Sequence, residues 1–278
     1  MTDTVAPARG WSALGGKKYW IVCQNGMQKV MVYRLNFFAW FLVEGLGFLV
    51  MAYLWLSIYK QGNQVGSYSL ATLLCYFAIS RVIGMTVMSD DMVRQINDDI
   101  SQGRLVNFLL KPISYVKKLF FQNVGEIIIA SIYTLPIAIP LAYYFRDQLS
   151  FTASRIALFL LAILIASCMD FFFNYLIGML TFYSENIYGI IFLSWTVTGI
   201  FSGRVVPIDL LPKALQQLAD FLPFKYVLFV PLSIISGRMT IADSAVELVF
   251  GLAWVILLWY GGRLLFNHGI KRYEGYGI

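Results

Sequence analysis

Long apolar runs alternate with short polar connections along most of the chain. A helix can cross the hydrocarbon core of a bilayer when it carries about 20 predominantly apolar residues. Runs of this kind occur near residues 36–59, 68–88, 119–145, 156–182, 187–202 and 245–266. The fifth run is short for a full crossing, and Pro136 and Pro140 interrupt the third. The pattern predicts an all-α polytopic membrane protein with six transmembrane helices.

The chain before the first apolar run divides into two parts. Residues 1–16 are polar and rich in glycine and alanine, so we expect a flexible tail. Residues 17–35 mix lysine and arginine with large apolar side chains. This mixture favours an amphipathic helix in the membrane interface over a plain lead-in to the first span. We expect residues 17–278 to form a single transmembrane domain.

A polar block at residues 89–118 separates the second and third apolar runs. Asp90 suits the positive end of a helix, and Gly103 can close that helix in a left-handed conformation. One apolar stripe repeats every four residues between them, at Met92, Ile96 and Ile100. Such a stripe indicates a short amphipathic helix, and Asp99 lies off it. Because the inner leaflet is negative, the acidic face favours a protein partner over lipid.

A proline-bearing segment at residues 203–242 precedes the last apolar run, with Pro207, Pro212 and Pro223 along it. Leucine and phenylalanine side chains opposite charged ones predict an amphipathic helix over 209–221, begun after the first of these prolines and ended before the third. Irregular backbone at membrane depth needs protein or water around it. The segment either lies in the outer interface or re-enters the membrane, as a lid over an exit path or as an anchor.

Charge adds an orientation to this picture. Only 13% of the residues are charged, whereas soluble domains carry about 25%. The basic residues are concentrated before the first run, in the block at 89–118 and after the last run. Connections rich in lysine and arginine stay on the cytoplasmic side of a membrane. We therefore expect both termini and the polar block to face the cytoplasm.

Four charged residues fall inside the predicted spans: Glu44, Arg81, Glu126 and Asp170. Charged side chains within a membrane usually face a bundle interior or a wet cavity, because exposure to hydrocarbon is costly. We predict a polar network with Arg81 at its centre, in the inner half of the membrane. Such a network could brace the helices, line a transport path or relay protons.

The remaining chemistry-bearing residues exclude several classes of protein. Cys23, Cys75 and Cys168 are far apart and His268 is the one histidine, which argues against a metal or redox site. The sequence has no phosphate-binding loop, so we expect no ATP hydrolysis by the chain alone. It has no nucleophile placed beside a base, which disfavours a lipid-modifying enzyme. Its basic residues follow topology and form no nucleic-acid patch.

The polar block carries a resemblance to a known family. The run INDDISQGRLVNFLLKPIS resembles the intracellular loop of type-2 ATP-binding-cassette (ABC) exporter permeases. The shared pattern falls on Ile96, Asp99, Ile100, Gly103, Leu105, Leu109, Lys111, Pro112 and Ile113. The C-terminal RYEGYGI resembles the tail of one branch of these permeases, and the prolines of 203–242 resemble those of their external segment. The short fifth span departs from the family pattern.

The resemblance implies that the chain is the permease half of an exporter in a bacterial inner membrane. A second permease half, identical or related, would pair with it among membrane lipid, and a separate ABC ATPase subunit would bind ATP and Mg²⁺. The chain itself would hold no cofactor. Its coupling helix would contact the ATPase through Asp90, Met92, Ile96, Asp99, Ile100 and Gly103. A membrane scaffold or assembly factor without transport activity is the alternative, and the substrate stays open.

Overall fold

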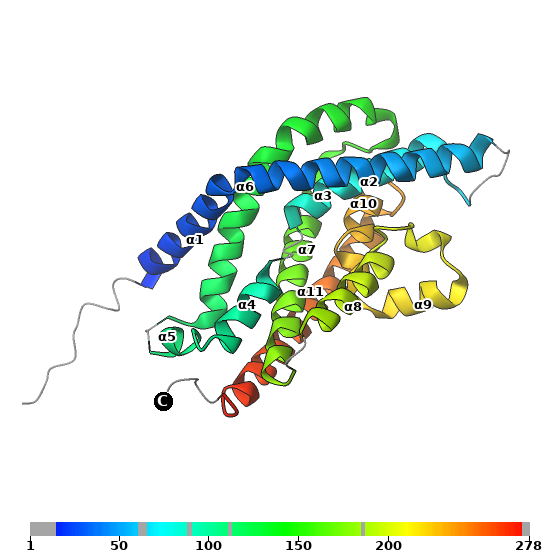
Figure 1. Ribbon diagram of the computed structural model, residues 1–278. Coiled ribbons are helices and arrows are strands. Elements are labelled where there is room, and N and C mark those ends of the chain that lie inside the picture. Colours follow the sequence, from blue (N-terminus) through cyan, green and yellow to red (C-terminus); the bar gives the residue numbers. More distant parts are fainter. Residues whose placement is uncertain (1–14, 61–65, 88–90, 111–112, 185–186, 274–278) are drawn as a thin grey trace, which may run out of the picture.

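The computed structural model describes residues 15–60, 66–87, 91–110, 113–184 and 187–273. These residues form a helical bundle (Figure 1). Its α-helices are α1 (Gly15–Val32), α2 (Arg34–Lys60), α3 (Leu70–Val87), α4 (Met92–Ser101), α5 (Val106–Leu109), α6 (Tyr115–Tyr144), α7 (Ala153–Met179), α8 (Ile187–Phe201), α9 (Lys213–Phe221), α10 (Phe229–Ile235) and α11 (Ile241–Gly269). Short 3₁₀ turns connect them: η1 (Arg146–Gln148), η2 (Leu180–Phe182), η3 (Ile208–Leu210) and η4 (Pro223–Tyr226).

Five helices of the described part are long and apolar enough to cross a membrane. They are α2, α6, α7, α11 and the helix that begins at Leu70. The predicted fifth span is also an apolar helix, α8, but it has only 15 residues. At 1.5 Å per residue it extends about 22 Å, less than the roughly 30 Å of a hydrocarbon core. The all-α membrane fold is confirmed, and α8 is too short to be counted as a sixth span.

The two prolines of the third apolar run do not end its helix. Pro136 and Pro140 both lie inside α6, which continues to Tyr144. Each proline removes one backbone hydrogen bond and crowds the preceding turn, which bends a helix. Figure 1 shows α6 turning sharply in its C-terminal part. The sequence therefore predicted the position of the disturbance, and the structure shows a bend there instead of an interruption.

The first helix packs against protein along α6. An ideal Cβ atom built on Gly26 would lie 2.1 Å from the Gln122 carbonyl oxygen, and one on Gly125 would lie 2.0 Å from the Cys23 carbonyl oxygen. The two backbones therefore touch, which only glycine allows. Other side chains of α1, such as Trp20 and Val32, remain exposed. The predicted helix exists, and one side of it, with Cys23 and Gly26 buried, lies on α6.

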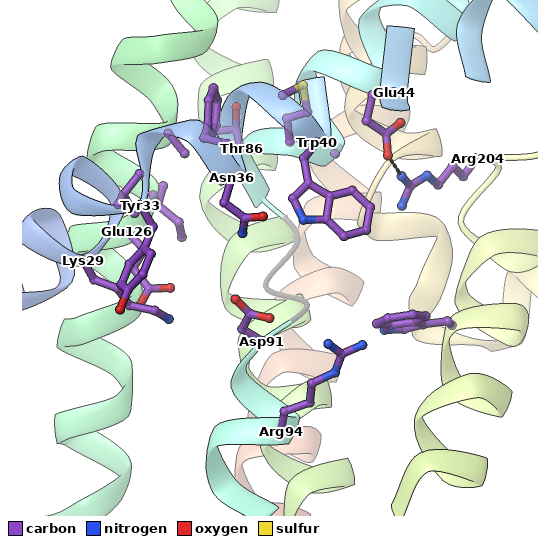
Figure 2. A pocket seen from close by; sticks show the side chains of 17 residues that line it. Lys29, Tyr33, Asn36, Trp40, Glu44, Thr86, Asp91, Arg94, Glu126 and Arg204 are labelled. Atoms are coloured by element: carbon purple, nitrogen blue, oxygen red, sulfur yellow. Dashed lines mark hydrogen bonds and ion pairs between the residues drawn. The ribbon is translucent and has the colours of Figure 1, made fainter. Parts of the chain in front are cut away.

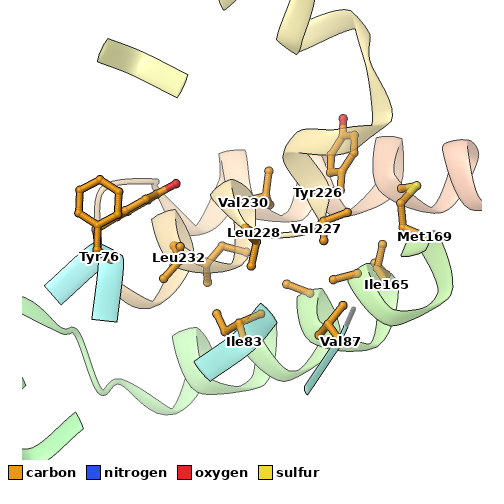
Figure 3. Packing of buried hydrophobic residues seen from close by; sticks show 14 of the residues in the cluster. Tyr76, Ile83, Val87, Ile165, Met169, Tyr226, Val227, Leu228, Val230 and Leu232 are labelled. Atoms are coloured by element: carbon orange, nitrogen blue, oxygen red, sulfur yellow. The ribbon is translucent and has the colours of Figure 1, made fainter. Parts of the chain in front are cut away.

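The main core forms where the proline-bearing segment folds back between the long helices. Figure 3 shows Ile83 of α3 facing Leu228, with Ile165 and Met169 of α7 at the end of the same cluster near Val227. The side chains of α10 are almost completely buried, and Ile234 has no exposed surface. Arg155 of α7 holds the end of α10, because its guanidinium donates to the carbonyl oxygens of Ile234 at 3.1 Å and Met239 at 2.9 Å. Part of the segment is thus interior to the bundle.

The helix expected over 209–221 begins later than predicted. Residues 208–210 form η3, and α9 starts at Lys213, directly after Pro212. Proline disfavours helical backbone in the residue before it, and Leu211 is accordingly extended, with ψ of 158°. The end of the helix at Phe221, before Pro223, agrees with the prediction.

Candidate functional site

The predicted coupling helix is α4, and its apolar stripe faces the chain's own core. Met92, Ile96 and Ile100 are all buried in a cluster with Phe171, Tyr175 and Met179 of α7. Ile96 has no exposed surface, and its Cδ1 atom lies 2.6 Å from where a Cβ on Gly178 would be. The stripe therefore fixes α4 to α7. These three side chains cannot touch another protein while that packing lasts.

The turn after α4 is fixed by Asp99 and Gly103. The Tyr115 hydroxyl donates to the Asp99 carboxylate at 3.0 Å, and Arg104 approaches the same carboxylate at 3.5 Å. The Asp99 carbonyl oxygen accepts from the Leu105 amide at 2.7 Å. Gly103 has φ of +73°, the left-handed conformation that the sequence predicted. Asp99 is thus 6% exposed and acts as a local brace. Asp90 lies outside the described residues.

A polar face of α4 points away from the core. Asn97 and Asp98 are partly exposed and Ser101 is exposed, one turn apart along the helix. The Asp98 carboxylate lies 3.8 Å from Arg104, and both of these side chains are 48% exposed. The surface that a partner could reach on α4 is therefore polar. Sequence reasoning chose the apolar stripe because an amphipathic pattern does not tell which face the protein itself covers.

Among the described residues, the intramembrane charges fall into separate clusters instead of gathering around Arg81 as predicted: Arg81 pairs with Glu44, whereas Glu126 pairs with Lys29. The centre of the first cluster is Glu44 of α2. Its carboxylate accepts from Arg81 of α3 at 2.9 Å and also from Arg204, which follows α8. Arg204 belongs to the proline-bearing segment, for which the sequence left open an interfacial or a re-entrant position. The short α8 lets this segment meet α2 part-way along its apolar length.

The other two predicted network residues have local partners. Glu126 of α6 pairs with Lys29 of α1 at 3.0 Å and accepts from Gln122 at 3.0 Å. Asp170 accepts from Asn174 at 3.0 Å, one turn further along α7. These contacts involve Lys29, Gln122 and Asn174, not Arg81. The sequence located each charge correctly, but the partners depend on helix packing that no local pattern encodes.

A cleft of about 400 Å³ lies between α2 on one side and α3, α4, α6 and α8 on the other (Figure 2). Its lining includes the charged residues Lys29, Glu44, Asp91, Arg94, Glu126 and Arg204. Its aromatic residues are Tyr33, Phe37, Trp40 and Trp195. Ligand pockets have volumes of about 300–1,000 Å³ and combine apolar walls with a few polar groups. The cleft has this character, and it joins two of the charged clusters to α4.

Arg94, Trp195 and Arg204 are cleft residues that sequence reasoning missed. The Arg94 guanidinium stacks over the Trp195 ring, 5.6 Å from its centroid. Arg94 is on the polar side of α4, and Trp195 is on an exposed side of α8. In the sequence, the position of Arg94 beside the apolar stripe was the one indication that α4 contributes a charged side chain to a site. Its pairing with a tryptophan about 100 positions later could not be foreseen from periodicity.

The far end of the molecule from α4 contains a polar latch made by Tyr68, Asp209 and Arg238. The Tyr68 hydroxyl donates to both Asp209 oxygens, at 2.9 and 3.0 Å, and Arg238 donates to one of them at 2.8 Å. The Arg238 guanidinium also stacks 3.6 Å above the Tyr68 ring. Burial, together with the Asp209 charge, raises the pKa of Tyr68 above its usual value. The latch holds η3 to the start of α3.

No group of three or more histidine, cysteine, aspartate or glutamate side chains gathers at metal-binding distance within the described ranges. The described residues that line the cleft offer ion pairing, hydrogen bonding and apolar contact. These features are typical of a binding or transport path.

Comparison with known proteins agrees with this geometry. Residues 46–277 match the family described as ABC-2 family transporter protein. No curated protein matches the sequence at a significant level. The family match covers most of the chain, including α4, the proline-bearing segment and most of the cleft. The chain belongs to the ABC-2 family of transporter membrane proteins.

Proposed function

We propose that the chain is the permease subunit of an ABC exporter, and that it forms half of a translocation path with the cleft as part of that path. A separate ATPase subunit supplies ATP hydrolysis with its own ATP and Mg²⁺. A second permease half, identical or related, completes the path within the lipid of a bacterial inner membrane. Both termini and α4 face the cytoplasm, as the distribution of basic residues predicts.

The position of α4 is the observation that carries this proposal. Its apolar stripe is locked on α7 by Ile96, its polar face with Asp98 and Ser101 is accessible, and Arg94 reaches the cleft. The helix α4 therefore offers a polar surface to a partner and also contributes the Arg94 side chain to the cleft. A push on the polar face would move α7 and the cleft wall together. Coupling requires such an element with contacts that differ between two states.

The coupling surface is thus reassigned within the predicted region. We assign contact with the ATPase to Asn97, Asp98 and Ser101, and we assign Met92, Ile96 and Ile100 to fixing the helix. Asp99 and Gly103 shape the turn that follows. This division explains why a coupling helix needs an apolar stripe: a docking element transmits force only when it is attached firmly to the helices that move.

Co-purification tests the proposal. The tagged chain is extracted from membranes in mild detergent, and proteins that accompany it are identified and assayed for ATP hydrolysis. We expect an ATPase subunit with the wild type and its loss with the double variant Asp98→Lys and Ser101→Lys. These positions are partly or fully exposed, so the charge reversal should leave the fold intact.

A matched control reverses charge at the other end of the bundle. Asp147→Lys with Ser154→Lys changes two exposed residues near η1, far from α4 along the chain. This variant should retain the ATPase. If the α4 variant also retains it at wild-type level, the docking surface is wrong. If no ATPase accompanies the wild type, the exporter proposal fails and a scaffold without transport becomes the better account.

A further inference from the structure

Arg94 is the cleft cation whose charge is least satisfied. It is exposed within the cleft lining, and its guanidinium lies over the Trp195 ring, 5.6 Å from the ring centroid. Within the described ranges it forms no ion pair. Stacking satisfies the face of a guanidinium and leaves its N–H groups available at the edge. Those edge donors match the two oxygens of a carboxylate or phosphate.

Four of the other charged residues of the cleft have partners among the described residues. Lys29 is paired with Glu126 at 3.0 Å, and Glu44 is bonded to Arg204. Asp91 also lines the cleft, at the residue before the first turn of α4. A carboxylate at that position is stabilised by the positive end of the helix. The same helix end disfavours the positive charge of Arg94, which an anionic ligand would neutralise. The binding free energy of an anion at Arg94 should therefore exceed that of a cation at Asp91.

The rest of the cleft favours an apolar group. Phe37, Trp40 and Ile127 contribute apolar surface to its wall, and the Trp195 ring lies under the Arg94 guanidinium. Figure 2 shows Trp40 in the cleft between Arg94 and Glu44. Flat aromatic walls bury apolar chains and rings well. A ligand that reaches both regions must be apolar over most of its length and charged at one end.

We propose that the cleft binds an anionic amphiphile, with its carboxylate or phosphate on Arg94 and its apolar part against Phe37 and Trp40. This proposal rests on the proposed function, because it names the class of substrate that the path carries. It assigns Arg94 as a binding residue and Trp195 as the platform that orients it. A lipid headgroup and an amphiphile from solution offer the same chemistry, and the experiment separates them.

Photo-crosslinking of the isolated chain tests the proposal. The chain is placed in phosphatidylcholine nanodiscs and exposed to a long-chain carboxylic acid with a diazirine in its tail, or to the primary amine with the same tail. We expect saturable labelling by the acid on peptides that contain Phe37, Trp40 or Trp195. The amine should label these peptides weakly. Equal or stronger specific labelling by the amine would overturn the proposal.

Two arginine variants sharpen the result. Arg94→Gln removes the charge, and the half-saturation concentration of the acid should rise about tenfold, the expected effect of losing one charge-assisted contact. Arg94→Lys should recover part of the affinity. Arg263→Gln is the matched control, because Arg263 is also exposed and also stacks 5.6 Å from a tryptophan ring, Trp259, outside the cleft lining. Unchanged affinity in Arg94→Gln would overturn the proposal.

Adding phosphatidylglycerol to the nanodiscs identifies the source of the ligand. If phosphatidylglycerol competes with the acid, the ligand is a lipid of the leaflet. If it does not compete, the ligand is an amphiphile from solution. Both results agree with an anionic ligand. The assay contains no ATPase, so its outcome is independent of co-purification. An ATPase that binds the chain while the acid does not bind would refute the ligand class alone. The reverse result would refute the exporter proposal alone.

Discussion

At the scale of single residues, two glycines set how closely α1 approaches α6. Gly26 and Gly125 stand where the two backbones touch, at distances that leave no space for a methyl group. Glycine lowers the stability of a helix relative to alanine. At this crossing glycine is required at both positions, because a Cβ atom would collide with the opposite backbone. The pair explains how α1 can cross α6 at backbone contact.

Gly125→Ala should therefore destabilise the protein by about 1–3 kcal/mol, because the new Cβ must push the Cys23 carbonyl away. The measurement is the midpoint of thermal unfolding in detergent. Gly45→Ala is the control: Gly45 also lies inside a helix, but no atom approaches its Cβ position within 4 Å. That variant should be neutral or slightly more stable. Equal effects at both sites would rule out the close crossing.

Glu44 is the second residue-scale feature, since it is the acceptor for both Arg81 and Arg204. Glu44→Leu removes the shared carboxylate and should cost about 1–3 kcal/mol, because it leaves two partly buried guanidinium groups without this acceptor. Arg81→Leu should cost less, because Glu44 keeps its contact with Arg204. Replacing both Glu44 and Arg81 by leucine should recover part of the loss. Thermal unfolding ranks the three variants, and a larger loss for Arg81→Leu than for Glu44→Leu would restore Arg81 as the centre.

At the scale of elements, the sequence predicted most of the helices and few of their contacts. Apolar runs located α2, α3, α6, α7 and α11, because the length of a membrane span is a property of the local sequence. Proline chemistry located the end of α9 correctly. The start of α9 was misplaced because the effect of Pro212 on Leu211 was not considered.

The element-scale failures share one physical cause. The pattern of α4 was read correctly, but Ile96 packs on Gly178, more than 80 positions away along the chain. The pairing of Glu44 with Arg204 likewise depends on how far α8 extends. Periodicity reports which face of a helix is apolar, and tertiary packing decides what covers that face.

The polar latch gives a prediction for the proline-bearing segment. Asp209→Asn should weaken the contacts of Asp209 with Tyr68 and Arg238, so η3 should open more often. Hydrogen exchange of peptides from 203–212 should become several-fold faster, in line with a loss of about 1 kcal/mol. Asp147→Asn changes an exposed pair whose side chains are 60% and 82% exposed, so exchange there should not change. Unaltered exchange in Asp209→Asn would show that the latch does not restrain the segment.

At the scale of the whole molecule, α2 is the least embedded of the long helices. Only 6% of its apolar window is buried, against 50% for the helix that begins at Leu70. Yet α2 forms one wall of the cleft and contributes Phe37, Trp40 and Glu44 to it. A wall held by few contacts can move at low cost, which suits a path that must open and close. Its exposed apolar side chains form the surface on which the proposed function expects lipid or a second permease half.

The measurement that tests the central claim most directly is a distance across the cleft in the complex with its ATPase. Spin labels are attached at Leu42 of α2 and Leu193 of α8, both exposed, after Cys23, Cys75 and Cys168 are replaced by alanine. We predict that ATP shifts the distance distribution in this labelled complex. The same labels with Asp98→Lys and Ser101→Lys should show no shift. An ATP-dependent shift that survives in that variant, or none in either protein, would contradict coupling through α4.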